Sequence, residues 1–220
     1  MRFGDFVVVI LVAGLAAFFL IPGTRHLYEI AYGHAPALLS FLKFGLLATA
    51  GEVLALRLNT GSYRTTGFGV FPKMIVWGFL GIAIYWAFII FASGTPNVFP
   101  AVRTLPAPWN TILNALAISV FMNIIFAPPM MLTHHLTDRF IADHGGRFPV
   151  AQLDLTDLLR RIDWERMWGF VFKKTIPFFW IPAHTVTFLL PEQYRVLFAV
   201  LLSVVLGLIL GSVRRTTTGS

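Results

Sequence analysis

Two adjacent histidines and an aspartate come nearest, by type and spacing, to a metal site in this chain. In the segment THHLTDRF, His134 and Asp138 stand four residues apart and so face the same side of a helix, with His135 beside them. No further histidine or carboxylate at ligand spacing completes the set, although His144 follows six residues after Asp138. The competing interpretation is a solvated helix end, which needs no ligand.

Other patterns of catalysis are absent from the sequence. It contains no Gly-x-Ser-x-Gly, no His-Glu-x-x-His and no glycine loop that would hold a phosphate. We therefore predict that the chain is not an enzyme and that it has no cofactor and no bound metal. A metal-dependent membrane enzyme built on His134, His135 and Asp138 remains an alternative.

Lys43 and Glu52 are charged residues inside one long apolar segment. A charge at the centre of a membrane costs at least about 2.5 kcal/mol, so such residues usually have a function. The two are nine residues apart, which places them half a turn out of phase on a helix, and they cannot pair with each other. We expect each to find a polar partner on another helix, or water. Alternatively, Glu52 is hydrated near Arg57 and Lys43 extends outward to the interface.

A polar stripe follows one face of a helix rich in proline. Trp180, His184, Thr187 and Pro191 share this face, and the backbone groups freed by prolines such as Pro182 are tolerated only against protein or water. We therefore expect the stripe to face the interior of a bundle. Because an unperturbed imidazole changes charge near about pH 6.5, His184 is expected to line a polar cavity and to make conductance depend on pH. A buried pair that only holds helices together is the alternative.

The composition places these residues in a membrane protein. Of the 220 residues, 57% are hydrophobic and 12% are charged, whereas about a quarter of a soluble chain is charged. An all-α bundle of about six membrane helices accounts for this excess. The apolar segments are Phe6–Pro22, Ala35–Leu56, Phe71–Ser93, Trp109–Leu132, Thr175–Leu190 and Tyr194–Ser212.

Three parts of the chain are distinguished. Residues 1–27 are predicted to hold an additional N-terminal membrane helix, because the apolar run is too long for a signal peptide and no small-residue cleavage site follows it. Residues 28–212 form the bundle, in which we expect prolines to break the fifth helix, and residues 213–220 form a polar tail. Before the fifth helix, apolar residues recur at helical spacing opposite charges, which predicts a surface helix on the membrane face or a solvated connector: Leu155, Leu158, Leu159, Ile162 and Trp168.

The basic residues predict the orientation. With the N-terminus inside, three lie in outer loops, Arg25, Arg103 and Arg195, and Lys43 lies within a span. Thirteen lie in inner segments: Arg2, Arg57, Arg64, Lys73, Arg139, Arg147, Arg160, Arg161, Arg166, Lys173, Lys174, Arg214 and Arg215. This bias predicts cytoplasmic termini. The net charge of +7 is therefore explained by the lipid bilayer as partner, not by nucleic acid, and the lack of cysteine excludes disulfides.

Small residues and prolines are predicted to shape the contacts between helices. In lipid, helices pack closely through glycines, and prolines bend them. The positions we assign to packing and kinks are Gly78, Gly81, Pro128, Pro182, Pro191, Gly207 and Gly211. No internal repeat of the kind found in many secondary transporters is visible.

Four segments, in order, resemble the Mpv-seventeen and twenty-two-kilodalton peroxisomal membrane protein family. YEIAYGHAPALLSFLKFGLLATAGEVLALRL is similar to its opening block, with Gly51-Glu52 in the place of Gly-Asp. WGFLGIAIYW and NIIFAPP are similar to its Gly-Phe-x-Gly…Trp-Tyr and Asp-Gln…Phe-Ala-Pro elements. In the C-terminal signature, His184 and Thr187 stand where the family has Gln and Asn, and Phe188, Pro191 and Arg195 match. The proline next to the tryptophan is displaced to Pro182, and one residue is missing before Pro191.

The resemblance covers roughly residues 28 to 212 and implies a small integral membrane protein, for which pore or metabolite-channel activity has been proposed in that family. We therefore expect a small pore that passes small polar solutes; a homo-oligomer is compatible with it. The expected lining is Lys43, Glu52, Tyr85, Asn123, Trp180, His184 and Thr187. The alternative is a scaffold that stabilises a membrane complex. A stripe facing water favours the pore, and one closed by direct hydrogen bonds favours the scaffold.

Overall fold

The computed structural model describes residues 6, 10, 13–14 and 17–218, with the surroundings of side chains up to residue 206. Within these ranges the chain is helical and has no strand, which confirms the all-α class. Of the expected first helix, Phe6–Pro22, residues 7–9, 11–12 and 15–16 lie outside the described residues. The elements are α2 (Pro22–His34), α3 (Pro36–Lys43), η1 (Phe44–Ala48), α4 (Thr49–Thr60), α5 (Val70–Val98), η2 (Pro100–Thr104), α6 (Trp109–Ile125), α7 (Ala127–Asp143), η3 (Val150–Gln152), α8 (Leu155–Arg160), α9 (Trp164–Arg166), η4 (Met167–Trp180), α10 (Ile181–Leu189) and α11 (Glu192–Thr218).

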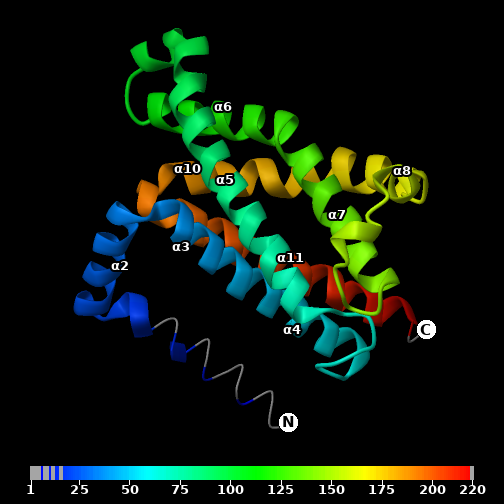
Figure 1. Ribbon diagram of the computed structural model, residues 1–220. Coiled ribbons are helices and arrows are strands. Elements are labelled where there is room, and N and C mark those ends of the chain that lie inside the picture. The colour runs from blue at the N-terminus through cyan, green and yellow to red at the C-terminus, as the bar shows by residue number, and fades with distance from the viewer. Residues whose placement is uncertain (1–5, 7–9, 11–12, 15–16, 219–220) are drawn as a thin grey trace.

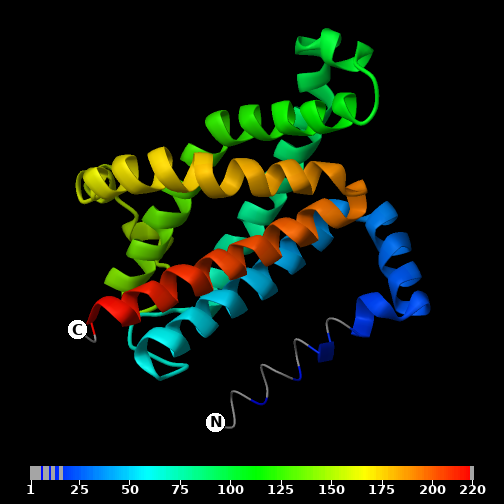
Figure 2. The same ribbon diagram turned by 180° about the vertical axis from the view of Figure 1, so that it is seen from behind.

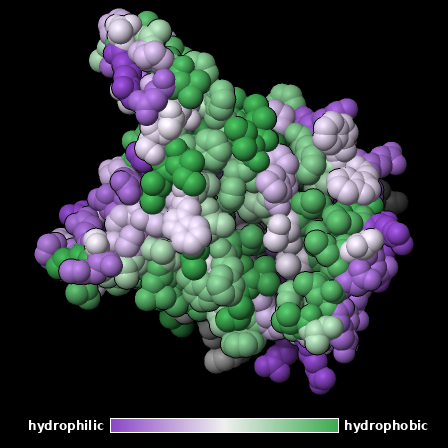
Figure 3. All heavy atoms as spheres, turned by 45° about the horizontal axis from the view of Figure 1, so that its top comes forward, coloured by the Kyte–Doolittle hydropathy of each residue, from purple (hydrophilic) through white to green (hydrophobic). Residues whose placement is uncertain are grey.

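Two helices in the described part of the chain are long and apolar enough to cross a membrane. One is the continuous helix Pro36–Thr60, formed by α3, η1 and α4, and the other is α5. The pair α6 and α7 passes the same test jointly but is bent by 46°, so it counts as a third span only if the bend lies within the membrane. Figure 3 shows hydrophobic side chains over the middle of one face and hydrophilic ones toward its edges, as a membrane protein requires. The expected number of six spans stays a prediction.

The long helices pack as crossing pairs. The helix Pro36–Thr60 lies beside α11 along most of its length, and α5 crosses in front of it (Figure 1). Seen from behind, η4 and α10 form one long rod that runs beside α6 (Figure 2). The interior between these layers is filled by large apolar side chains, among them Phe44, Trp77, Met122 and Val200.

Glycines on α5 allow its close approach to α3 and η1. A Cβ atom at Gly81 would lie 2.5 Å from the carbonyl oxygen of Ser40, and one at Gly78 would lie 2.4 Å from the ring of Phe41. Both are shorter than any normal contact, so only glycine fits. This supports the packing role predicted for Gly78 and Gly81, whereas Gly207 and Gly211 lie outside the residues whose surroundings are described.

The prolines do not break the fifth helix as we expected. Helix η4 has π winding and contains Pro177, and it continues directly into α10, where Pro182 lies in the first turn. Wider winding shifts the hydrogen-bond pairing and so accommodates a residue without an N–H group. The helix ends at Leu189; Leu190 is extended, as residues before proline prefer, and Pro191 separates α10 from α11. Pro128 lies in the first turn of α7, just after the bend that follows α6.

The expected surface helix is two short helices. Asp154 accepts a hydrogen bond from the backbone of Asp157 and caps α8, and Asp163 accepts one from the backbone of Arg166 and caps α9. A cap residue has non-helical backbone, so a second cap within the segment divides it. Leu158 and Ile162 are buried against α7, whereas Leu155 and Trp168 are exposed. Helix α11 continues to Thr218, through most of the segment expected to be a polar tail.

Candidate functional site

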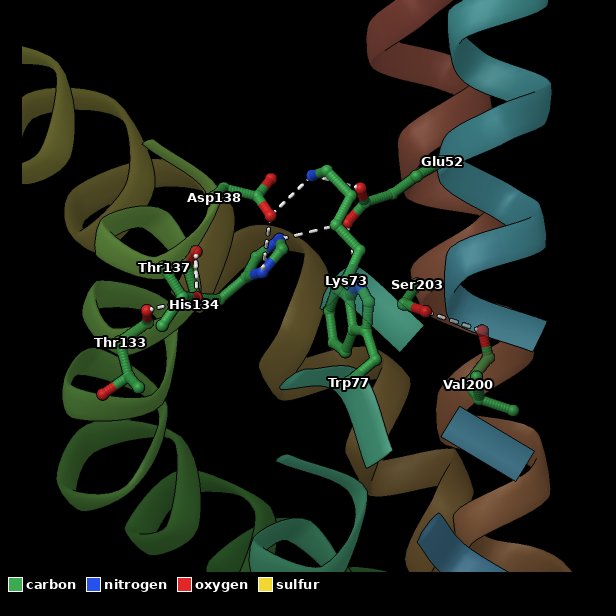
Figure 4. Close-up of polar contacts among 9 residues, drawn as sticks. All are labelled: Glu52, Lys73, Trp77, Thr133, His134, Thr137, Asp138, Val200 and Ser203. Atoms are coloured by element: carbon green, nitrogen blue, oxygen red, sulfur yellow. Dashed lines mark hydrogen bonds and ion pairs between the residues drawn. The ribbon is translucent and has the colours of Figure 1, made fainter. Parts of the chain in front are cut away.

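Three helices bring a lysine between two carboxylates. The Nζ atom of Lys73 on α5 donates hydrogen bonds to Oε2 of Glu52 on α4, at 2.7 Å, and to Oδ1 of Asp138 on α7, at 2.5 Å. Figure 4 shows that the Lys73 amine lies between the carboxylates of Glu52 and Asp138. This confirms that Glu52 has a polar partner on another helix.

Trp77 and His134 complete this arrangement, which we call the charged cluster (Glu52, Lys73, Trp77, His134 and Asp138). Trp77 Nε1 donates a hydrogen bond of 2.6 Å to Oε1 of Glu52, and the rings of Trp77 and His134 lie 4.3 Å apart. The Nε2 atom of His134 is 3.5 Å from Oε1 of Glu52, and its Nδ1 atom is 3.8 Å from Oδ1 of Asp138. One imidazole therefore faces both carboxylates.

The cluster is short of positive charge. Its two carboxylates carry two negative charges, and Lys73 supplies one positive charge. The exposed fractions of the side chains are 8% for Lys73, 21% for Glu52, 26% for His134 and 31% for Asp138, so water solvates them only in part. Desolvated charge is costly unless it is compensated, and within this cluster one carboxylate charge has no lysine of its own.

Local structure explains how these side chains meet. Lys73 and Trp77 are four residues apart at the start of α5, and His134 and Asp138 are four apart on α7, so each pair shares one face. The loop before α5 passes close to the end of α7: Gly69 has φ of 64°, and a Cβ atom there would lie 2.7 Å from the carbonyl oxygen of Gly146. This approach, possible only for glycine, brings the start of α5 to Asp138.

A cavity of about 370 Å³ adjoins the cluster, and we call it the inner cavity. It lies between α4, α5, α7, η4 and α11. Glu52 and His134 contribute to one wall, and the exposed Arg166 and the half-buried Thr175 border it. Its lining is Ala48, Gly51, Glu52, Ala55, Trp77, Met130, Met131, His134, His135, Arg166, Met167, Phe170, Val171, Thr175, Trp180, Ser203, Val204 and Leu206. The inner cavity is therefore lined by both polar and apolar groups.

The predicted stripe is closed by direct contacts. The Nδ1 atom of His184 lies 3.0 Å from Nδ2 and 3.2 Å from Oδ1 of Asn123, and its ring stacks on Trp180 at 5.1 Å. Ser119 joins the same network by donating to the carbonyl oxygen of Ile181. Thr187 is fully buried and donates to the carbonyl oxygen of Ala183 on its own helix.

The space beside His184 is small. Asn123, Trp180 and His184 border a cavity of about 50 Å³. This cavity is mostly apolar, whereas we expected His184 to line a polar one. Trp180 also lines the inner cavity, and its Nε1 atom has no hydrogen-bond partner among the described residues. Of the stripe, Trp180 alone touches the larger space.

The remaining predicted lining residues lie elsewhere. Lys43 donates a hydrogen bond of 3.0 Å to the hydroxyl of Tyr28 on α2, which confirms its expected partner on another helix. Burial raises the pKa of Tyr28, so its hydroxyl stays neutral. Tyr85 lines a different cavity, of about 250 Å³, together with Tyr32, Glu192 and Arg195. The seven predicted residues thus do not share one space.

Sequence reasoning found part of the charged cluster and missed the rest. Glu52, His134 and Asp138 were singled out separately, and their ligand atoms lie within 4.8 Å of one another. Glu52 is therefore the third residue of a set that could hold a metal ion, which local spacing around His134 did not supply, whereas His135 is not in the set. Lys73 was counted only among the basic residues of the inner segments; its four-residue spacing to Trp77 was the available signal, but it does not identify Glu52 as the partner.

The comparisons with known proteins add no relative. No protein-family model, no curated protein and no solved structure matches the chain. The resemblance of motifs stays an expectation, and functional inference rests on the geometry of the cluster and the inner cavity.

Proposed function

We propose that the chain is a multi-pass membrane protein that lets small polar solutes cross the bilayer through the inner cavity. In this proposal about six helices span the membrane and both termini are cytoplasmic. The observation that carries it is the charged cluster beside that cavity. The motif resemblance to the Mpv-seventeen and twenty-two-kilodalton peroxisomal family supports the same class of function.

Charged groups in a membrane bundle normally face a water-filled space or one another, and they mark pathways of solutes and ions. Here the carboxylate of Glu52 is both paired with Lys73 and exposed to the inner cavity. Glu52 lies in the first turn of α4, five residues before Arg57, and Lys73 lies at the start of α5, nine residues after Arg64; the positive-inside rule assigns both arginines to the cytoplasmic side. The inner cavity would then be a vestibule on that side.

The size and lining of the inner cavity suit small polar molecules. At about 30 Å³ for each water, a volume of 370 Å³ holds on the order of ten waters or one small solute. Glu52, His134 and Arg166 offer charged or polar contacts, and Met130 and Phe170 offer apolar ones. A solute that enters keeps hydrogen-bonding partners and does not have to lose all its hydration at once.

A matched pair of substitutions on α4 tests the proposal. Ala55 lines the inner cavity, whereas Ala50 is exposed on the same helix and lies outside it. Ala55→Phe should fill part of the cavity and lower the flux of a size series of uncharged solutes, measured by the swelling of liposomes that contain the purified protein. Ala50→Phe makes the same change in volume without touching the cavity and should leave the flux unchanged.

Wild-type liposomes that swell no faster than empty ones would contradict permeation. Equal flux in both variants would show that solutes do not use the inner cavity. Folding of each variant is checked by a monodisperse elution profile and thermal unfolding in detergent. This control distinguishes a variant that is misfolded from a folded variant whose cavity is blocked.

A non-transporting scaffold is the second candidate, favoured by the closure of the stripe. His184, Asn123 and Ser119 form hydrogen bonds with one another and with the backbone, beside a cavity of about 50 Å³. Such a network holds α6 against α10 and needs no solute. If liposomes show no flux, co-purification of a defined membrane complex that disperses on deletion of this chain would support the scaffold.

A further inference from the structure

We propose that Glu52, His134 and Asp138 form a binding site for a first-row divalent cation, and that Lys73 is a tethered counter-cation displaced on binding. Zn²⁺, Mn²⁺ and Co²⁺ are members of this class. The inference rests on the charged cluster alone and holds whether or not solutes cross through the inner cavity.

The donor set is chemically suited to such an ion. One imidazole and two carboxylates are ligands that zinc, manganese and cobalt accept, and the three come from separate turns of α4 and α7. A site with three protein ligands leaves a position open for water or a solute. Here that position would face the inner cavity, which Glu52 and His134 line.

The distances require only a small adjustment. The three ligand atoms lie within 4.8 Å of one another. Metal–ligand bonds of about 2.0–2.2 Å place two ligands of one ion at most about 4.4 Å apart. Side-chain rotations that move the ligand atom of His134 or Asp138 by a few tenths of an ångström would bring the three atoms within this distance. The Nδ1 atom of His134 is buried and makes no hydrogen bond among the described residues, so it loses no hydrogen bond if it binds an ion.

The position of Lys73 shows that the site favours a cation. Its ammonium group contacts both carboxylates, at the place where an ion would bind. The same nitrogen lies 5.1 Å from the centre of the Phe68 ring, an aromatic face that can hold an ammonium group. The Phe68 ring is therefore an additional contact of the ammonium group, which a lysine displaced from the carboxylates can keep.

Displacement of Lys73 would change the packing of the bundle. The lysine links the start of α5 to α4 and α7, and a bound ion would link α4 to α7 without α5. Metal binding would thus loosen α5 at this end of the protein.

The test is a titration of the full-length, chelator-treated protein in detergent with Co²⁺, followed by visible absorption and by calorimetry. We expect one saturable site. His134→Gln and Asp138→Asn should each weaken binding by at least about tenfold, since loss of a ligand costs no less than loss of its supporting contacts. His135→Gln changes the adjacent histidine, which is outside the ligand set, and should leave the Co²⁺ affinity within about twofold of wild type. Lys73→Met should strengthen binding by about tenfold or more, because a competing charge is removed.

Several results would overturn the proposal. Absence of saturable Co²⁺ binding to the wild-type protein would do so, and so would equal binding by the His134→Gln and His135→Gln variants, which would indicate adventitious binding elsewhere. If Lys73→Met does not fold, thermal unfolding decides instead: Co²⁺ should raise the melting temperature of the wild type and of His135→Gln but not of His134→Gln. A rise of the same size in all three would reject the site.

Discussion

The ammonium nitrogen of Lys73 lies 2.7 Å from Oε2 of Glu52 and joins two helices that are long enough to cross a membrane. The lysine side chain is nearly inaccessible to water, and the carboxylate is held further by the indole of Trp77. Water therefore reaches the lysine poorly when Glu52 is removed, although Asp138 stays in contact with it. The pair also fixes the start of α5 against α4, next to the inner cavity.

Breaking this pair should destabilise the protein. Removal of one partner from a fully buried ion pair costs about 3–5 kcal/mol, and the partial exposure of Glu52 reduces this to about 2–3 kcal/mol. We expect Glu52→Gln and Lys73→Met each to lower the melting temperature in detergent. The double variant should lose less than the sum of the two single losses, because Glu52 and Lys73 are then both replaced by neutral side chains, although Asp138 loses its lysine in both variants that lack Lys73.

An exposed pair provides the comparison. Arg161 and Asp157 are in contact, and both side chains are nearly half exposed. Arg161→Gln should therefore change the stability by less than about 1 kcal/mol. If the double variant at Glu52 and Lys73 loses the full sum of its two single losses, the two residues do not act as a pair.

Close packing against α5 gives a prediction at Gly81. A methyl group there would meet the carbonyl oxygen of Ser40, which is backbone and cannot rotate away, so Gly81→Ala should cost about 1–3 kcal/mol. Gly94 is on the same helix and has no neighbour within 4 Å of its added Cβ atom. Gly94→Ala should be neutral or stabilising by up to about 1 kcal/mol. Equal melting temperatures for the two variants would show that α5 does not approach α3 this closely.

Sequence reasoning identified individual charged residues better than their partners. The high cost of charge in an apolar segment drew attention to Lys43 and Glu52, and each does have a partner on another helix. The identity of the partners depends on how helices pack, which one sequence does not contain. Lys73 was counted with the inner segments and not with the buried charges, because it lies in the first turn of α5, where the apolar segment begins.

The fold was predicted most successfully where a single physical property dominates. Apolar composition indicated an all-α fold with helices able to cross a membrane, of which the described residues include two, and glycine spacing indicated a close contact of α5. Backbone details that depend on local hydrogen bonding, such as winding at prolines and helix caps, were predicted less well. The prolines of the fifth segment are accommodated by π winding in η4, and two aspartate caps divide the expected surface helix into α8 and α9.

The orientation in the membrane is open to a direct test. Thirteen basic residues in inner segments against three in outer loops predict cytoplasmic termini. Reporter fusions placed after Gly23 and after Pro100 should therefore be outside the cytoplasm, measured by a pair of reporters active on opposite sides. A fusion at either site that is active in the cytoplasm would overturn the six-helix arrangement.

His184 distinguishes a packing role from a gating role for the stripe. Because its ring stacks on Trp180 and its Nδ1 atom lies beside the amide of Asn123, a change to leucine leaves a buried amide without its partner. His184→Leu should therefore cost about 1–3 kcal/mol in thermal unfolding, whereas His184→Gln, which can still bond the amide, should cost less than about 1 kcal/mol. The small apolar cavity beside the ring leads us to expect that solute flux into liposomes has the same pH dependence in wild type and His184→Gln. A pH response that is present in the wild type and flattened in His184→Gln would instead make this histidine part of the conduction pathway, as the sequence alone predicted.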